Sequence, residues 1–217
     1  MSCSCSPLVD ATANHFDEHR VRKELEAYRK AGPAVTTRGL LNLLAMEPPP
    51  ETLLDIGAGL GVLAVGMLKA GANHAICVDL SPAAIAVSRE EAERQAIAAR
   101  IDWLEGDFVA IAASVPPADL VVLDRVVCCY PAYAPLLEQA AAHSRRRLAI
   151  SFPRASWWVR LGVGIENAWR RVQGDRFRAF VHSPGAMAAL LAHHGFRRVR
   201  EAATWSWQLE IYARSTT

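Results

Sequence analysis

The stretch from Leu53 to Gly61 reads LLDIGAGLG, and it decides the fold. It predicts a buried strand that runs into a turn rich in glycine, after which a helix begins. Glycine permits positive φ angles and lets the backbone approach a ligand closely, and the free N–H groups at a helix N-terminus attract polar or negative groups. The third glycine, Gly61, comes one residue earlier than in the Gly-x-Gly-x-x-Gly loop of nicotinamide-binding domains. The spacing therefore disfavours a dehydrogenase that uses NAD.

Acidic residues follow later apolar runs, each where a strand is expected to end. Asp79 ends the run ICVD, Asp107 and Phe108 follow the next predicted strand, and Asp124 ends the run DLVVLD. Ligands of open α/β sheets bind at the carboxyl ends of the strands, and a carboxylate in the place of Asp79 can accept hydrogen bonds from ribose hydroxyls. These pieces predict one ligand site along a single edge of the sheet.

In this order, the four pieces resemble the class I methyltransferases that use S-adenosylmethionine (SAM), over roughly residues 37–213. The resemblance implies that the glycine loop cradles the methionine part of SAM. It also implies that Asp107 accepts a hydrogen bond from the adenine amino group, and that the apolar Phe108 flanks the adenine ring. The cofactor-binding residues expected on this basis are Asp55, Gly57, Gly59, Gly61, Asp79, Leu80, Asp107, Phe108 and Asp124.

The rest of the chain predicts an α/β fold. Apolar runs without polar alternation take turns with helical stretches, which indicates a parallel sheet covered on both faces. Residues 196–203 and 205–213 read as a terminal β-pair. We expect a Rossmann-like, mostly parallel seven-stranded sheet with an antiparallel pair at the C-terminal side. The prolines at 48–50 separate an N-terminal helical lead, residues 1–50, from a SAM-binding domain, residues 51–217, with a helical insertion at about 154–182.

The composition is that of one globular domain. The chain has 217 residues, of which 52% are hydrophobic and 21% charged, enough for one buried core and short for two domains. No run reaches the ~20 apolar residues of a membrane span, and residues 1–7 lack the pattern of a signal peptide, so we expect a cytoplasmic protein. The five cysteines are scattered, and paired metal-ligand spacings are absent, so we expect reduced thiols and no metal site.

Charge is placed unevenly along the chain. Between Arg145 and Arg200 there are twelve arginines and two acidic residues, a net charge of +10, although the whole chain carries only +2. Such a segment indicates either an anionic partner or a solvated, arginine-rich surface. Inside it, residues 157–172 predict an amphipathic helix, whose apolar stripe suits the core, a dimer contact or a membrane surface.

A narrower resemblance rests on residues 124–131 (DRVVCCYP), residues 151–154 (SFPR) and the helix at 157–172. These stretches resemble the group of magnesium-protoporphyrin IX methyltransferases. The resemblance implies esterification of a carboxylate on a flat anionic ring, with aromatic stacking and arginine pairing. That group has His where this chain has Cys129, but a carboxylate is already ionised and needs little help from a base. The candidate catalytic residues are Tyr28, Tyr130 and His182, and the candidate acceptor-binding residues are Arg154, Trp157, Trp158 and Arg160.

We therefore expect a SAM-dependent methyltransferase that acts on a small anionic acceptor, a tetrapyrrole carboxylate being the sharpest version, with no nucleic acid as partner. Contact with a membrane surface and the oligomeric state stay open. The alternatives are methylation of another small molecule or of nucleic acid, or a non-catalytic SAM-binding protein. The nucleic-acid alternative is weakened because no Asn/Asp-Pro-Pro-Tyr element and no Pro-Cys pair follows the fourth predicted strand.

Overall fold

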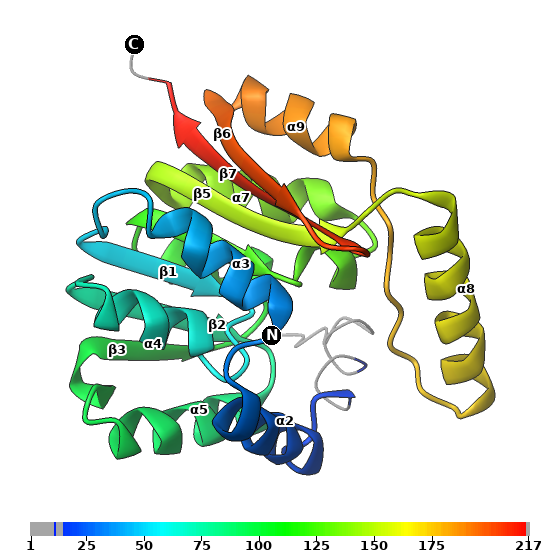
Figure 1. The fold of residues 1–217 in the computed structure, drawn as a ribbon, viewed down its shortest axis with the longest axis horizontal. Helices are drawn as coiled ribbons and strands as arrows, with labels where there is room; N and C mark the ends of the chain where they lie inside the picture. Colours follow the sequence, from blue (N-terminus) through cyan, green and yellow to red (C-terminus); the bar gives the residue numbers. More distant parts are fainter. Residues whose placement is uncertain (1–10, 12–14, 216–217) are drawn as a thin grey trace, which may run out of the picture.

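The computed structural model describes Ala11 and residues 15–215, which form a seven-stranded sheet with helices on both faces (Figure 1). The strand order is β3-β2-β1-β4-β5-β7-β6; the strands from β3 to β5 are parallel, and β7 runs antiparallel to both β5 and β6. The predicted architecture is confirmed. The strands are β1 (Thr52–Ile56), β2 (His74–Asp79), β3 (Ile101–Glu105), β4 (Ala118–Asp124), β5 (Ser144–Pro153), β6 (Phe196–Ala203) and β7 (Trp207–Arg214).

Helices pack on both faces of the sheet, with α3, α4 and α5 on one face and α6, α7 and α9 on the other. Side-chain caps begin α2, α5, α6 and α9. In α5, for example, the Ser81 hydroxyl accepts a hydrogen bond from Ala84 N and Pro82 holds the first helical position,. The described helices are α2 (Glu18–Ala31), α3 (Val35–Leu44), α4 (Val62–Lys69), α5 (Pro82–Arg94), α6 (Phe108–Ile111), α7 (Tyr133–His143), α8 (Trp157–Val172) and α9 (Pro184–His193).

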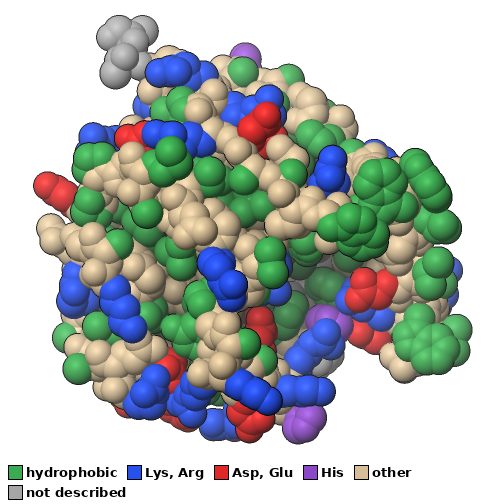
Figure 2. Space-filling view, in the orientation of Figure 1, with side chains coloured by type: hydrophobic (Ala, Val, Ile, Leu, Met, Phe, Trp, Pro, Cys, Tyr) green, Lys and Arg blue, Asp and Glu red, His purple; other side chains and the backbone are tan. Residues whose placement is uncertain are grey.

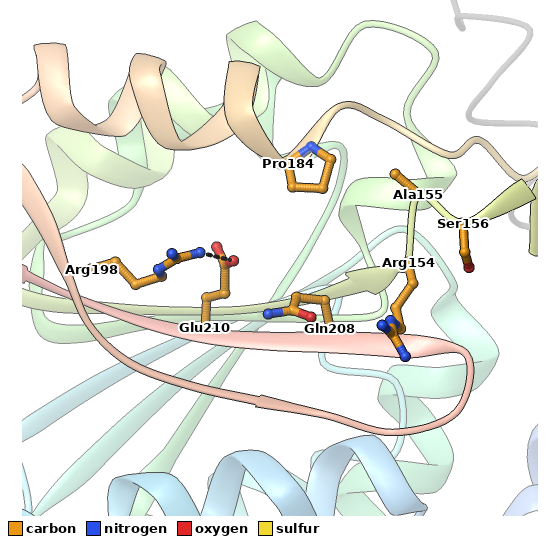
Figure 3. A pocket seen from close by; sticks show the side chains of 7 residues that line it. All are labelled: Arg154, Ala155, Ser156, Pro184, Arg198, Gln208 and Glu210. Carbon is orange, nitrogen blue, oxygen red and sulfur yellow. Dashed lines mark hydrogen bonds and ion pairs between the residues drawn. The ribbon is translucent and has the colours of Figure 1, made fainter.

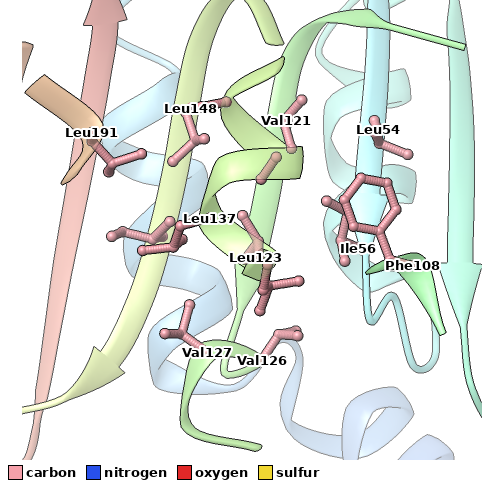
Figure 4. Packing of buried hydrophobic residues seen from close by; sticks show 14 of the residues in the cluster. Leu54, Ile56, Phe108, Val121, Leu123, Val126, Val127, Leu137, Leu148 and Leu191 are labelled. Carbon is pink, nitrogen blue, oxygen red and sulfur yellow. The ribbon is translucent and has the colours of Figure 1, made fainter. Parts of the chain in front are cut away.

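The core is divided between the two faces of the sheet because successive side chains of a strand point to opposite sides. Leu54 and Val121 point to the face covered by α6, α7 and α9, where Leu137 and Leu191 meet them (Figure 4). Leu53 belongs to the cluster on the opposite face. Burial on both sides explains why the strands of the parallel part are apolar without alternation.

The parallel strands end at one edge of the sheet, and α8 lies beyond this edge, apart from the sheet (Figure 1). The bounds of α8 are those predicted, but its apolar stripe does not enter the core. The side chains of this stripe are between 56% and 78% exposed, and Val159 is the buried apolar residue of the helix. The exposed apolar residues of α8 are Trp157, Leu161, Ile165, Trp169 and Val172.

Among the described residues, helices α2 and α3 precede β1, and α2 packs on α5 beside the edge where the strands end. The division into a lead at residues 1–50 and an insertion at about 154–182 stays a prediction. Within the described part of the chain, no helix is both long and apolar enough to cross a membrane.

Candidate active site

The glycine loop wraps the end of β1, where Gly57, Gly59 and Gly61 all have φ between +55° and +66°. A Cβ on Gly57 would lie 2.5 Å from a methyl of Val126, and one on Gly61 would lie 2.8 Å from the Ser88 hydroxyl. A Cβ on Gly59 would meet nothing within 4 Å. Gly57 and Gly61 are thus required by packing and backbone geometry, whereas Gly59 faces open space in which a ligand can approach the backbone.

Asp79, at the end of β2, joins the strand to this loop. Gly59 N donates to Asp79 Oδ2 at 2.7 Å, and Ser81 N donates to Oδ1 at 2.8 Å. Burial raises the pKa of Asp79, and these backbone donors oppose that rise. Each carboxylate oxygen has a second lone pair, so Asp79 can accept further hydrogen bonds from a ligand. Leu80, which follows it, is half-buried.

Two more acids belong to the same edge. Asp55 is 2% exposed, and Asp55 Oδ2 has no hydrogen-bond partner among the described residues. Burial, followed by the charges of Asp124 and Asp79, raises the pKa of Asp55 to about 8. Asp124 accepts hydrogen bonds of 2.5 Å from the hydroxyls of Thr37 and Ser151. Asp55 therefore lies beneath the loop, and Asp124 is fixed at the end of β4.

Asp107 and Phe108 separate in space although they are neighbours in sequence. Asp107 caps α6 and accepts a hydrogen bond of 2.7 Å from the Tyr130 hydroxyl. Phe108 is 1% exposed and packs beside Ile56 in the core (Figure 4). That Phe108 flanks an adenine ring stays a prediction, and in the described structure its ring is part of the core.

The three candidate catalytic residues do not form one group. Tyr130 is buried and bound to Asp107, and burial raises the pKa of its hydroxyl further above the ordinary value. Tyr28 is half-buried and packs against α5 residues through the cluster around Leu25. His182 Nε2 donates to the carbonyl oxygens of Tyr130 and Val127, at 2.9 and 3.2 Å. Nε2 therefore carries the proton, which leaves Nδ1 as the acceptor nitrogen of the neutral ring. That His182 acts as a base stays a prediction.

The expected acceptor-binding residues are also dispersed. Arg154 lines a cavity of about 270 Å³, together with Gln208 and an ion pair between Arg198 and Glu210 (Figure 3). Trp157 is 73% exposed on the outer side of α8. Arg160 is exposed and Trp158 is half-buried. A single aromatic and basic pocket made by these four residues is not what the structure shows.

Other residues, which sequence reasoning did not single out, do come together beside the edge. His15 Nδ1 donates to Asp175 Oδ2 at 2.8 Å, and the His15 ring stacks on Phe177 with 4.3 Å between centroids. The carbonyl of Phe16 accepts a hydrogen bond from the Ser81 hydroxyl. His15 and Asp175 are 160 positions apart, so no local pattern signals their contact.

Cys129 lies close to this edge in the short turn at Val127–Cys129. Its thiol is half-buried, and it lies 3.5 Å from the carbonyl oxygen of Arg125. Hydrogen bonding with the Cys128 thiol, and the positive charge of Arg125, lower the pKa of Cys129. Cys3 and Cys5 lie outside the described residues.

The part of the chain that contains the glycine loop is similar in sequence to known methyltransferases. The family model of ribosomal protein L11 methyltransferase (PrmA) matches residues 31–127. The ribosomal protein L11 methyltransferase of Pelotomaculum thermopropionicum is 34% identical over 106 residues, which are 48% of this chain and 34% of that protein. The release factor glutamine methyltransferase of Cereibacter sphaeroides is 36% identical over 117 residues, 54% and 39% of the two chains. The chain thus spans about a third to two fifths of the length of these relatives.

Solved structures extend the likeness to the whole fold. Magnesium protoporphyrin IX methyltransferase from Synechocystis PCC 6803 with bound SAH has a TM-score of 0.75 at 19% identity, covering 96% of this chain and 100% of that chain. Human N-acetylserotonin methyltransferase in complex with SAM has a TM-score of 0.66 at 19% identity, covering 94% and 59%. At such identities the likeness concerns the fold alone.

These comparisons correct one expectation and support the main one. The relatives that match by sequence are named for protein acceptors, ribosomal protein L11 and a release factor, which contradicts the expected small-molecule partner. The tetrapyrrole carboxylate and the cytoplasmic location stay predictions. The strand order, the glycine loop joined to Asp79, and the likeness to methyltransferases in both sequence and fold agree with one another. The chain is therefore similar to class I SAM-dependent methyltransferases, in sequence over residues 31–127 and in fold over most of its length.

Proposed function

We propose that the protein binds SAM at the edge formed by the glycine loop and Asp79, and transfers the methyl group to a nucleophile on a protein. The observation that carries the first part is the hydrogen bond from Gly59 N to Asp79 Oδ2, beside the open space at Gly59. A glycine backbone and a carboxylate then face the same space, as a ligand with an amino acid part and a ribose requires. The second part is supported by the relatives named for protein acceptors.

Three acids at the edge, Asp79, Asp107 and Asp124, have a role in this proposal. SAM supplies a methyl group on a sulfonium, and the lone pair of the acceptor forms the new bond to carbon while the carbon–sulfur bond breaks. Asp79 accepts from the ribose hydroxyls, and Asp107, oriented by the Tyr130 hydroxyl, accepts from the adenine amino group. Asp124, fixed by Thr37 and Ser151, adds negative charge where a cation binds,. The fixed positions of these groups align the reactants, which is the main demand of an in-line displacement.

The test of the cofactor site is calorimetric titration with SAM. Wild type is expected to bind in the micromolar range, about −8 kcal/mol. Asp79→Asn is expected to bind at least about tenfold more weakly, because hydrogen bonds to a charged group contribute about 1.5–3 kcal/mol. Asp102→Asn is the matched control, since Asp102 lies on β3, is 67% exposed and forms its side-chain hydrogen bond with His74, away from the glycine loop. A wild-type protein that does not bind SAM would contradict the proposal.

The test of the acceptor uses SAM labelled on its methyl group. Purified ribosomal proteins and release factors are incubated with wild type and with Asp79→Asn, and label is expected in a protein band with wild type alone. Magnesium-protoporphyrin IX and RNA are run in parallel. Label in either of these, and none in protein, would overturn the protein acceptor. SAM binding without transfer to any of them would favour a non-catalytic SAM-binding protein.

A further inference from the structure

Arg170 differs from the other residues near the end of α8 because its side chain is turned inward. The side chain is 12% exposed, whereas the neighbouring Arg171 is exposed. Arg170 Nη2 donates to Glu166 Oε1, and the guanidinium carbon lies 4.9 Å from the centre of the Phe177 ring. Arg170 Nη1 is buried and has no hydrogen-bond partner in the described part of the chain. Buried N–H groups in native proteins are almost always paired, so this one calls for a functional explanation.

Arg170 lies among groups of both charges. Arg178 Nη1 donates to the carbonyl oxygens of Asp175 and Phe177, both at 2.6 Å, and Arg20 lies 6.0 Å from the Phe16 ring. His15 counts as neutral near pH 7, because burial lowers its pKa despite the contact with Asp175. Glu166 is 55% exposed and contacts Arg170 only through Nη2, so the buried Nη1 still lacks a partner among the described residues. A carboxylate of a ligand would supply that partner.

This cluster is connected to the edge of the sheet where SAM is proposed to bind. The segment after α8 returns across the edge, since Phe180 N donates to Cys128 O at 2.8 Å and Asn167 exchanges two hydrogen bonds with Ala179. On the other side, the Phe16 carbonyl is bound to Ser81, two residues after Asp79. Figure 2 shows a hollow between α8 and the body of the sheet, with basic, acidic and histidine side chains at its rim.

We propose that Arg170 binds a carboxylate of the methyl acceptor through Nη1. An N–H donor of a guanidinium bound to a carboxylate forms a charge-assisted hydrogen bond, which is stronger than a neutral one. The inference rests on the proposed function, because it takes the hollow beside the SAM edge as the place where the acceptor enters. It assigns to Arg170 the role that the sequence suggested for Arg154 and Arg160.

The test uses benzoate as a carboxylate probe and benzamide as its neutral counterpart, each titrated into 15N-labelled protein and followed by NMR. Wild type is expected to show saturable benzoate binding near residues of the cluster, and Arg170→Gln to bind benzoate about tenfold more weakly or worse. Arg171→Gln is the matched control, because it removes the same charge from the next position of the same helix. Benzamide is expected to bind all three proteins weakly.

Two results would overturn the proposal: benzoate binding that Arg170→Gln leaves unchanged, or a loss of binding that Arg171→Gln reproduces. If Arg170→Gln does not fold, Arg170→Lys replaces it, since lysine keeps the positive charge but lacks the Nη1 group. That variant is expected to bind benzoate more weakly than wild type, and equal binding would also overturn the proposal. SAM titrations of the same proteins test the proposed function separately, because the benzoate readout does not require SAM.

Discussion

Asp55 combines complete burial with a carboxylate oxygen that has no partner among the described residues. In the folded protein the pKa of Asp55 is raised to about 8, whereas in an unfolded chain it is near 3.8. Between these two pH values the folded state therefore binds more protons than the unfolded state. The free energy of unfolding falls as pH rises through this window. Above about pH 8, Asp55 is ionised in both states, so its ionisation lowers the free energy of unfolding no further,.

We predict that Asp55→Asn becomes more stable relative to wild type as pH rises from 5 to 8. Asparagine has almost the same shape but cannot ionise, so it removes this penalty. Urea unfolding of both proteins at several pH values measures the difference in free energy of unfolding. A difference that stays constant with pH would show that Asp55 titrates normally.

The glycines of the loop provide a second prediction at the residue scale. Gly57→Ala and Gly59→Ala both place a Cβ at positive φ, but only the first brings it to 2.5 Å from Val126. We expect Gly57→Ala to lose about 1–3 kcal/mol more stability than Gly59→Ala, the usual cost of overpacking. Gly59→Ala is expected to weaken SAM binding, because its Cβ enters the open space. Chemical unfolding and SAM titration of the pair check both statements, and equal stabilities would refute the packing argument.

Among the elements, the segment at His15–Phe16 and the segment after α8 depend on each other. His15 pairs with Asp175 and stacks on Phe177, and Arg20 and Arg170 are close enough to affect its charge. Burial lowers the pKa of His15 below 6.5. The unfolded state thus binds more protons below that pH, and the contact loses stability as the medium becomes more acidic.

We predict that limited proteolysis within residues 15–30 and 173–180 becomes faster as pH falls from 7 to 5. His15→Phe keeps an aromatic ring but cannot titrate or pair with Asp175, so its cleavage is expected to be faster at pH 7 and nearly independent of pH. Asp17→Asn, which alters the cap of α2 without touching Asp175, is a suitable control. Cleavage of wild type that does not change with pH would contradict this view of the contact.

The same elements show which structural features the sequence predicts and which it does not. The strands, the terminal antiparallel pair and the bounds of α8 follow from periodicity, capping residues and glycine stops, which act locally, whereas the strand order does not. Helix α5 ends at Arg94, and Ala96 just after it adopts a φ of 57°, which no sequence pattern predicts. The stripe of α8 was correctly located, but amphipathicity alone does not say whether an apolar face meets the core or the solvent. The position of Arg170 could not be predicted for the same reason, because the sequence does not show which of the twelve arginines between Arg145 and Arg200 turn inward.

For the whole molecule, binding of SAM is expected to raise stability by mass action. At a free concentration 100 times the dissociation constant, the gain is about 2.7 kcal/mol, which corresponds to a rise in Tm of roughly 5–11 °C for a chain of this size. Thermal unfolding with increasing SAM measures this, and Asp79→Asn is expected to show a much smaller shift. A wild-type Tm that does not move with SAM would contradict the cofactor site.

The position of β7 has a consequence for how the protein is made. This strand follows β6 in the chain but lies between β5 and β6 in the sheet. A nascent polypeptide that ends before Trp207 has therefore no partner for β6, while the hydrogen-bonding groups of β5 remain open on that side. Unpaired strand edges of this kind are prone to aggregate. The exposed edge of β5 is covered only once residues 207–214 have been made. A chain that terminates just before residue 207 should therefore be bound by chaperones or degraded by proteases.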